Sequence, residues 1–304
     1  MNKAHLVVAL SISLFVSLSA CLAEQNKAPR QQAAPAEAIP NVRLSKWQRG
    51  LSVDSTVRPD MRMYLWFYEW QLFDAIEKGQ MTHGVWTGRD VVFRDRQSGK
   101  ITLPTTVSED HLSGSVVAAE RGLRLDMKAV PDGAEMTLTV TNRSDQDWPN
   151  LAAIIPCFNP GPEATRNEQF ANTNTYFHSS KGLRPLAIRA PREMHFNREL
   201  RAAVDAETNA HGKYAWSFKW PTSNVDAVDG LIIRESKDRR WVTGIAWERF
   251  VSVQGHNPWQ CMHLSVNIGP LKKGETRTVH GKIYLLKGTR EELLARYKHD
   301  FNRQ

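Results

Sequence analysis

Two runs of alternating apolar and polar residues, joined by a short turn, constrain the fold more than any other part of this chain. The first run spans residues 123–129 and the second 136–140, with Pro131-Asp132-Gly133 between them. Such a tripeptide is typical of a tight turn. Since successive side chains of a strand point to opposite faces, the pattern predicts an antiparallel hairpin with one buried face. Its apolar members are Leu123, Leu125, Met127, Ala129, Met136, Leu138 and Val140.

Further short segments have the composition of strands. Each is rich in β-branched, aromatic or aliphatic residues and is bounded by turn residues. They are residues 151–158, 214–220, 230–233, 241–253, 262–268 and 278–286. Because no helical segments alternate with them, the sequence predicts a mainly β protein, a large antiparallel β-sandwich.

Two segments show helical spacing. Tyr68, Leu72 and Ile76 recur every fourth residue before Gly79, which predicts a helix there. Near the C-terminus, Thr289 and Glu292 have the spacing of a capping box, which predicts a short C-terminal helix packed on the sheet. The apolar stripe of that helix would be Leu293, Tyr297 and Phe301.

The N-terminus is similar to a bacterial export signal. Lys3 precedes an apolar segment, Leu6–Val16, which is too short to span a bilayer. Leu18-Ser19-Ala20-Cys21 resembles the lipobox, a resemblance that implies acylation of Cys21. Leu22 in the next position favours an outer-membrane or surface anchor, in the periplasm or on the cell surface. Ordinary cleavage near Ala23, followed by secretion, is the alternative.

Three parts are therefore expected: a signal peptide with lipobox in residues 1–21, a disordered tether in residues 22–42, and a single β-sandwich domain in residues 43–304. The tether is rich in Gln, Ala and Pro, so it cannot bury enough apolar surface to become ordered. No low-complexity break interrupts the remainder, and a β-sandwich of that length commonly forms one domain.

Charge and the absence of known motifs narrow the function. The chain has 40 Lys and Arg against 32 Asp and Glu, and the excess is spread along it. For an exported protein, this favours an anionic polysaccharide or lipid headgroups over nucleic acid as partner, although simple solubility also accounts for it. The lack of Gly-x-Ser-x-Gly, phosphate-loop and dinucleotide motifs weighs against esterases, kinases and dehydrogenases.

Residues 247–263 hold the densest set of candidate catalytic side chains. The segment is predicted to run as strand, turn and strand, with His256 in the turn and His263 on the same face as Cys261. Imidazole titrates near neutral pH, so His256 and His263 could act as general acid and base, with Glu248 as the partner carboxylate. Alternatively, a strand histidine is a hydrogen-bonded core residue.

No cofactor is predicted. The histidines match no metal motif, although a site assembled from distant strands, with His83 or His178, stays open. Calcium sites are not readable from such a sequence. Cys157 and Cys261 could form one disulfide or remain two buried thiols.

Aromatic and polar residues beside predicted turns are candidates for sugar binding. The ring of Trp86 or Trp259 could stack on the apolar face of a pyranose, with Asn257 alongside Trp259. A polar segment after Pro162 contains Arg166 and Tyr176, and its arginine could neutralise a carboxylate or sulfate of a glycan. A solvated surface is the simpler interpretation of the arginine.

Two resemblances follow from these residues. The hairpin Gly122–Asn142, followed by Trp148 and a buried strand, resembles the supersandwich of galactose-mutarotase-like proteins, a fold also found in polysaccharide lyases. Residues 247–263 and 269–288 look like exported proteins of planctomycete-type bacteria, a resemblance that implies no activity. In mutarotases two histidines and a glutamate surround the sugar. The resemblance implies that some of four residues surround the sugar here in the same way, although no motif assigns a role to any one of them. These residues are His83, His178, His263 and Glu248.

The sequence thus leads to one main hypothesis, an exported lipoprotein that binds or processes carbohydrate. As an enzyme it would be a polysaccharide lyase or a sugar epimerase that uses His and Glu acid–base chemistry on an anionic glycan. The alternative is a non-catalytic glycan-binding or structural lipoprotein of the cell envelope.

Overall fold

The structure is a computed structural model that describes residues 39–47, 50–58, 60–71, 76–77, 80–81, 104–119, 122–143, 147–161, 170–211, 221–255 and 260–301. Residues 38–304 form one compact unit. The expected signal peptide, Cys21 and most of the expected tether lie outside the described residues, as does the strand expected at residues 214–220.

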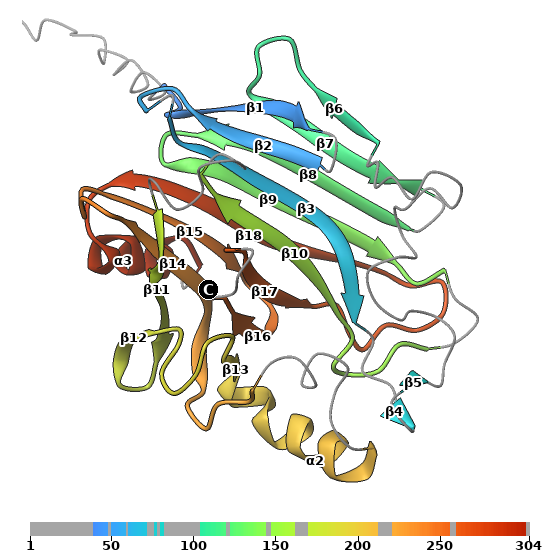
Figure 1. The fold of residues 1–304 in the computed structure, drawn as a ribbon. Helices are drawn as coiled ribbons and strands as arrows, with labels where there is room; N and C mark the ends of the chain where they lie inside the picture. Colours follow the sequence, from blue (N-terminus) through green and yellow to red (C-terminus); the bar gives the residue numbers. More distant parts are fainter. Residues whose placement is uncertain are drawn as a thin grey trace, which may run out of the picture. The chain divides into compact units, whose positions relative to one another are not determined.

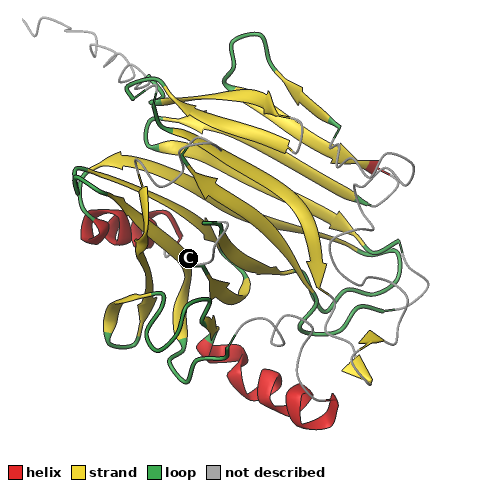
Figure 2. Ribbon diagram, viewed as in Figure 1, coloured by secondary structure: helices red, strands yellow, loops and turns green. Residues whose placement is uncertain are grey.

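Two antiparallel sheets make up the fold, as Figures 1 and 2 show. One has seven strands, in the order β1 (Val42–Trp47), β2 (Gly50–Ser55), β3 (Arg62–Gln71), β10 (Ala153–Pro160), β17 (Met262–Asn267), β16 (Phe250–Gln254) and β13 (Met194–Phe196). The other has nine strands, in the order β12 (Gly182–Pro185), β11 (Phe170–Ser179), β14 (Ala227–Ser236), β15 (Trp241–Trp247), β18 (Thr276–Lys287), β9 (Gly133–Thr141), β8 (Leu123–Val130), β7 (Ser113–Ala118) and β6 (Thr105–Val107). Strands β4 (Ile76–Glu77) and β5 (Gln80–Met81) pair separately. The predicted mainly β, antiparallel sandwich is confirmed.

The predicted hairpin is β8 and β9. Its register pairs Leu125 with Leu138 and Met127 with Met136, and all four side chains are buried. They join one core with residues of the seven-stranded sheet, among them Leu51, so the alternating apolar face points between the sheets. The burial of this face is the physical reason for the strict alternation in the sequence.

Helix α3 (Arg290–Phe301) confirms the predicted C-terminal helix and its capping box. The Thr289 backbone N–H donates to Glu292 Oε2 at 2.7 Å, and the Glu292 N–H donates to Thr289 Oγ1 at 3.2 Å. Leu293 and Tyr297 are buried against Leu231 and other residues of the nine-stranded sheet. This second cluster lies on the sheet face opposite the main core, so α3 covers that face.

The prediction of a helix around Tyr68–Ile76 is wrong for the residues of this segment that the structure describes. Tyr68 lies in strand β3, which pairs with both β2 and β10, and Ile76 lies in the short strand β4. A short apolar run cannot distinguish the two periods by itself. Here the aromatic composition of residues 64–70 and pairing on both sides favour the strand.

A second helix, α2 (Arg201–His211), was not expected. It follows the 3-10 turn η2 (Arg198–Leu200), where Asn197 Oδ1 accepts the Glu199 N–H at 2.9 Å. Its buried contacts are few: Val204, with Leu200 and Ala203 partly buried beside it, packs in a small cluster with Phe196 and Val251. Because the apolar stripe of this helix is so narrow, the helical period is hard to recognise in the sequence.

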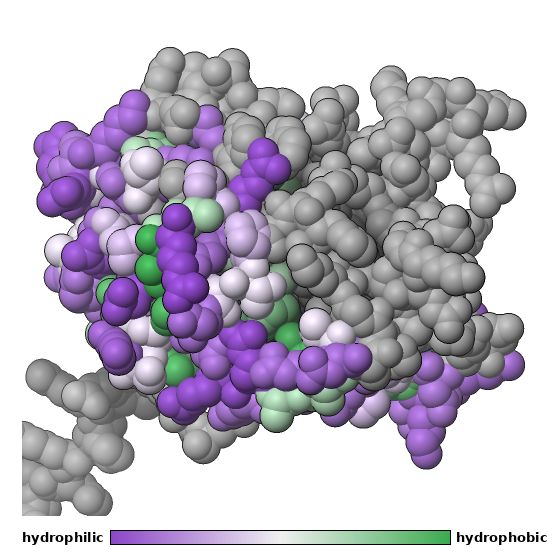
Figure 3. Space-filling model, turned by 60° about the horizontal axis from the view of Figure 1, so that its bottom comes forward, coloured by the Kyte–Doolittle hydropathy of each residue, from purple (hydrophilic) through white to green (hydrophobic). Residues whose placement is uncertain are grey.

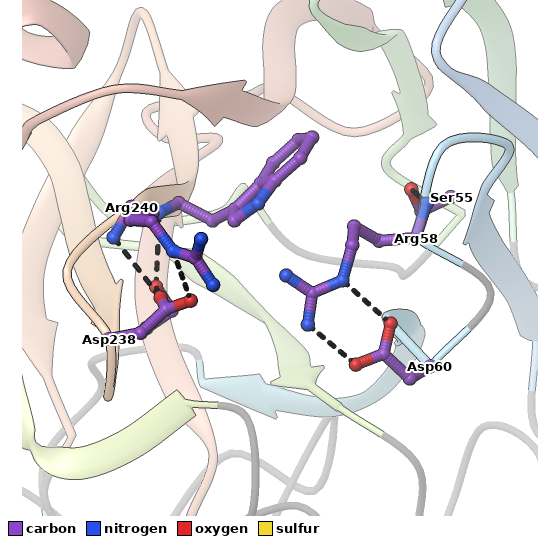
Figure 4. A network of polar contacts seen from close by, with 7 residues as sticks. Ser55, Arg58, Asp60, Asp238 and Arg240 are labelled. Carbon is purple, nitrogen blue, oxygen red and sulfur yellow. Dashed lines mark hydrogen bonds and ion pairs between the residues drawn. The ribbon is translucent and has the colours of Figure 1, made fainter.

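Two arginine–aspartate pairs lie in neighbouring turns, one turn from each sheet (Figure 4). Arg58 donates to both carboxylate oxygens of Asp60, at 2.9 and 2.7 Å, and Arg240 Nε donates to Asp238 Oδ2 at 2.9 Å. The Arg58 guanidinium lies 5.9 Å from the ring centre of Trp241. Hydrogen bonds from the Ser236 hydroxyl and the Arg240 backbone lower the pKa of Asp238 to about 2.

The described part of the surface drawn in Figure 3 is mostly hydrophilic. On the face drawn in Figure 3, purple side chains predominate among the coloured atoms and green ones form small separate patches. Large hydrophobic residues that are exposed in the described part of the chain are Ile39 and Val57. Among the described residues, no helix has the length and apolar character needed to cross a membrane.

Candidate functional site

A histidine–aspartate pair lies on the outer face of the nine-stranded sheet, beside α3. His178 on β11 brings Nδ1 to 2.5 Å from Asp229 Oδ2 on β14. Their side chains are 15% and 16% exposed, so solvent reaches both. No partner for His178 Nε2 lies among the described residues. When the imidazole is neutral, a carboxylate that accepts from Nδ1 selects the tautomer with Nε2 unprotonated, the form in which Nε2 can accept a proton.

An aromatic ring and a guanidinium adjoin this pair. Tyr176, two residues before His178 on β11, shares its face of the sheet. The Arg290 guanidinium, at the start of α3, lies 4.3 Å from the Tyr176 ring centre. Arg290 also pairs with Glu291 Oε1 at 2.8 Å and Glu235 Oε2 at 3.4 Å. The hydrogen bond from Arg290 lowers the pKa of Glu291. This end of the site therefore holds both the Arg290 cation and the Glu291 carboxylate.

His263 occupies a different environment, in the seven-stranded sheet. Its side chain is buried, and Nε2 lies 3.2 Å from Cys157 Sγ on the paired strand β10. Cys261 and Cys157 are both buried and form no disulfide. The expectation that Cys261 and His263 share a face is confirmed, since both lie beside Cys157.

Glu248 lies in the exposed turn between β15 and β16. Its Oε1 accepts the backbone N–H of His280 at 2.7 Å. Glu248, His178 and His263 thus each contact different neighbours. Among the described residues, no contact joins these three side chains to one another. The remaining predicted site residues lie outside the described part of the chain: His83, His256, Trp86, Trp259, Asn257, Arg166 and Cys21.

Several residues of these sites were not predicted. Asp229 lies 51 residues after His178, and Arg290 is more than 100 residues after Tyr176, so only strand pairing and helix packing bring them together. Asn159, near the end of β10, is fully buried beside the two thiols. No local pattern in the sequence signals these partners.

No protein-family model matches the chain, and no curated protein matches it. Solved structures similar to it include a galactose mutarotase-like protein from Lactobacillus casei, with a TM-score of 0.41 and 12% identity over 82% of this chain and 99% of the other. A putative aldose 1-epimerase from Escherichia coli K12 has a TM-score of 0.39 and 9% identity over 81% and 99%. A polysaccharide lyase has a TM-score of 0.37 and 10% identity over 85% and 35%. These likenesses are too distant to transfer an activity or a site residue.

Proposed function

We propose that the protein is an exported, lipid-anchored protein that binds and processes an anionic carbohydrate at the site formed by Tyr176, His178, Asp229 and Arg290. The observation that carries this proposal is the 2.5 Å contact between His178 Nδ1 and Asp229 Oδ2 on a solvent-reached sheet face. Such a pair is a usual arrangement for acid–base catalysis. An adjacent ring and cation suit the apolar face and the carboxylate of a uronate sugar.

The chemistry would be proton abstraction next to the uronate carboxylate. His178 Nε2 takes the proton from C5, and Asp229 stabilises the imidazolium that forms. The C5–H electron pair then forms the C4=C5 double bond, while the bond from C4 to the glycosidic oxygen breaks. That oxygen takes a proton from the Tyr176 hydroxyl or from water. Arg290 would bind the carboxylate, on which negative charge develops. Delivery of a proton from the Tyr176 hydroxyl or from water to the opposite face of C5 would instead give epimerisation.

The experiment is an assay of the purified protein on a panel of uronate-rich and neutral glycans. Elimination is followed by the ultraviolet absorbance of the new double bond and epimerisation by exchange of the C5 proton with deuterated solvent. His178→Asn and Asp229→Asn should each lower kcat by about 10²- to 10⁴-fold, the usual contribution of a general base. His299→Asn is the matched control, because His299 also pairs with an aspartate, Asp300, but on the exposed side of α3.

Two other results would redirect the proposal. Glycan binding without turnover, weakened by Tyr176→Ala, would establish the non-catalytic binding protein instead. No binding to any glycan would favour a structural role in the envelope. The lipid anchor is tested separately: Cys21→Ser should move the protein from the membrane fraction to the soluble one, and retention in the membrane would exclude acylation of Cys21 as the anchor.

A further inference from the structure

A buried cluster of metal-ligand side chains lies in the seven-stranded sheet, apart from the site proposed above. The Sγ atoms of Cys157 and Cys261 and a ring nitrogen of His263 all lie within 4.8 Å of one another. Strand pairing places Cys157 opposite His263, and Cys261 immediately precedes β17. Cys157 is fully buried, while Cys261 and His263 are 4% and 5% exposed, which leaves a narrow contact with solvent.

Asn159 points its amide at this cluster. Its Nδ2 lies 3.4 Å from Cys261 Sγ and 3.9 Å from Cys157 Sγ, and the side chain is fully buried. Its Oδ1 has no hydrogen-bond partner among the described residues. A buried acceptor left without a hydrogen bond destabilises the folded protein. Rotation of the amide by half a turn would exchange the two atoms and point Oδ1 at the sulfurs, where a cation would satisfy it.

A buried positive charge accompanies the thiols. Arg234 is fully buried and donates only to neutral oxygens in the described residues, those of Thr175, Asn172 and the Gln260 carbonyl. A guanidinium is charged at neutral pH, and the Gln260 carbonyl that accepts from Arg234 Nη1 at 2.8 Å belongs to the residue before Cys261.

The charges indicate which cation fits. Thiolates bind soft ions, above all Cu⁺ and Zn²⁺, and imidazole suits both. Two thiolates with one monovalent cation leave a single negative charge, which the Arg234 guanidinium cancels. With a divalent cation the same group would carry a net buried positive charge, which is costly in a protein interior.

We propose that Cys157, Cys261 and His263 bind one Cu⁺ ion, with Asn159 at the open side of the ion. This proposal does not depend on the carbohydrate site, since no described contact joins the cluster to His178 or Asp229. Its failure and the failure of the glycan assay can therefore be told apart.

The test uses the full-length chain with Cys21→Ser, so that the thiols of Cys157 and Cys261 are the only ones left. The reduced protein should bind one Cu⁺ per chain in anaerobic competition with the chelator bicinchoninate. Copper X-ray absorption should show two sulfur ligands and one nitrogen. Cys261→Ser and His263→Gln should weaken binding by at least about 100-fold, more than the loss of a neighbouring group such as Asn159 would cause. His280→Gln, at an exposed position of β18 outside the cluster, should bind as the parent does.

Three results would overturn the proposal. One is less than one Cu⁺ per chain in the parent, or a copper spectrum without sulfur. Another is Zn²⁺ that remains bound in the presence of excess Cu⁺, which would contradict the charge argument. The third is a lack of free thiols in the denatured, unreduced protein, which would mean that Cys157 and Cys261 form a disulfide. If the substituted proteins do not fold, the absorption spectrum of the parent still decides.

Discussion

The Nζ of Lys282, on strand β18, lies 2.8 Å from Asp300 Oδ2, on helix α3. The same ammonium is 2.8 Å from Asp132 Oδ1, in the β8–β9 turn, and the Tyr284 hydroxyl donates to Asp300 Oδ2 at 3.0 Å. The Lys282 side chain is only 7% exposed. This one cation therefore joins the C-terminal helix, the sheet and the central hairpin.

Removal of that charge should destabilise the protein strongly. Lys282→Met keeps the length of the side chain but removes the buried cation between Asp132 and Asp300, which keep only the half-exposed Arg296, with Nε 2.7 Å from Asp132 Oδ2 and 3.6 Å from Asp300 Oδ1. Breaking one side of a buried ion pair costs about 3–5 kcal/mol. Urea unfolding followed by tryptophan fluorescence should show a midpoint well below that of the parent.

The control for this prediction is Arg124→Met. Arg124 pairs with Asp126 at 2.6 Å, but both side chains are largely exposed, so the unfolding midpoint should not change measurably. Equal effects of the two substitutions would show that burial of the Lys282 pair contributes nothing.

The same network makes stability depend on pH. Burial of Asp300 opposes its ionisation, but hydrogen bonds from Lys282 and His299 outweigh this and lower the pKa of the carboxyl. A carboxyl with a lower pKa in the folded state stabilises it above the unfolded pKa, near 4, and this stabilisation disappears as the pH falls further. The urea midpoint should therefore drop between pH 5 and pH 3. Asp300→Asn should flatten that part of the curve, and parallel curves for the two proteins would contradict the assignment.

The predictable parts of the fold are those that depend on the spacing of residues close together in the sequence. The alternation in residues 123–140 and the three-residue step from Thr289 to Glu292 each encode a contact between near neighbours in the chain. The alternation of Cys261 and His263 likewise placed both on one face. In each case the geometry of one element, strand or helix, is enough to bring the side chains together.

The candidate sites depend on pairing between distant strands, which no local pattern records. Lys282 is a polar residue in an alternating strand and so is expected to face solvent, yet α3 covers it. Arg234 sits in the apolar strand β14, and its partners come from β11 and from the residue before Cys261. Asp229 lies beside His178 only because β11 pairs with β14. Such relationships appear only when the order of the strands is known.

The capping box of α3 can be tested by substitution of Thr289. Thr289→Ala removes the Oγ1 that accepts the Glu292 N–H, so the unfolding free energy should fall by about 1 kcal/mol. Thr278→Ala, on an exposed position of β18, is the control and should have a much smaller effect. If both cost the same, the cap is not what stabilises this end of the helix.

A glycine in the central hairpin tests how tightly β9 and β18 approach. Gly133 has a φ of 147°, and a Cβ there would lie 1.9 Å from the Ile283 carbonyl oxygen. Gly133→Ala must therefore push two paired backbones apart, and we expect a loss of more than about 3 kcal/mol or failure to fold. Gly274 has a φ of 80° but no atom within 4 Å of the added Cβ, so Gly274→Ala has backbone strain alone, about 1–2 kcal/mol. Thermal unfolding of the two variants separates close packing from strain, and equal melting temperatures would mean that β18 moves freely away from β9.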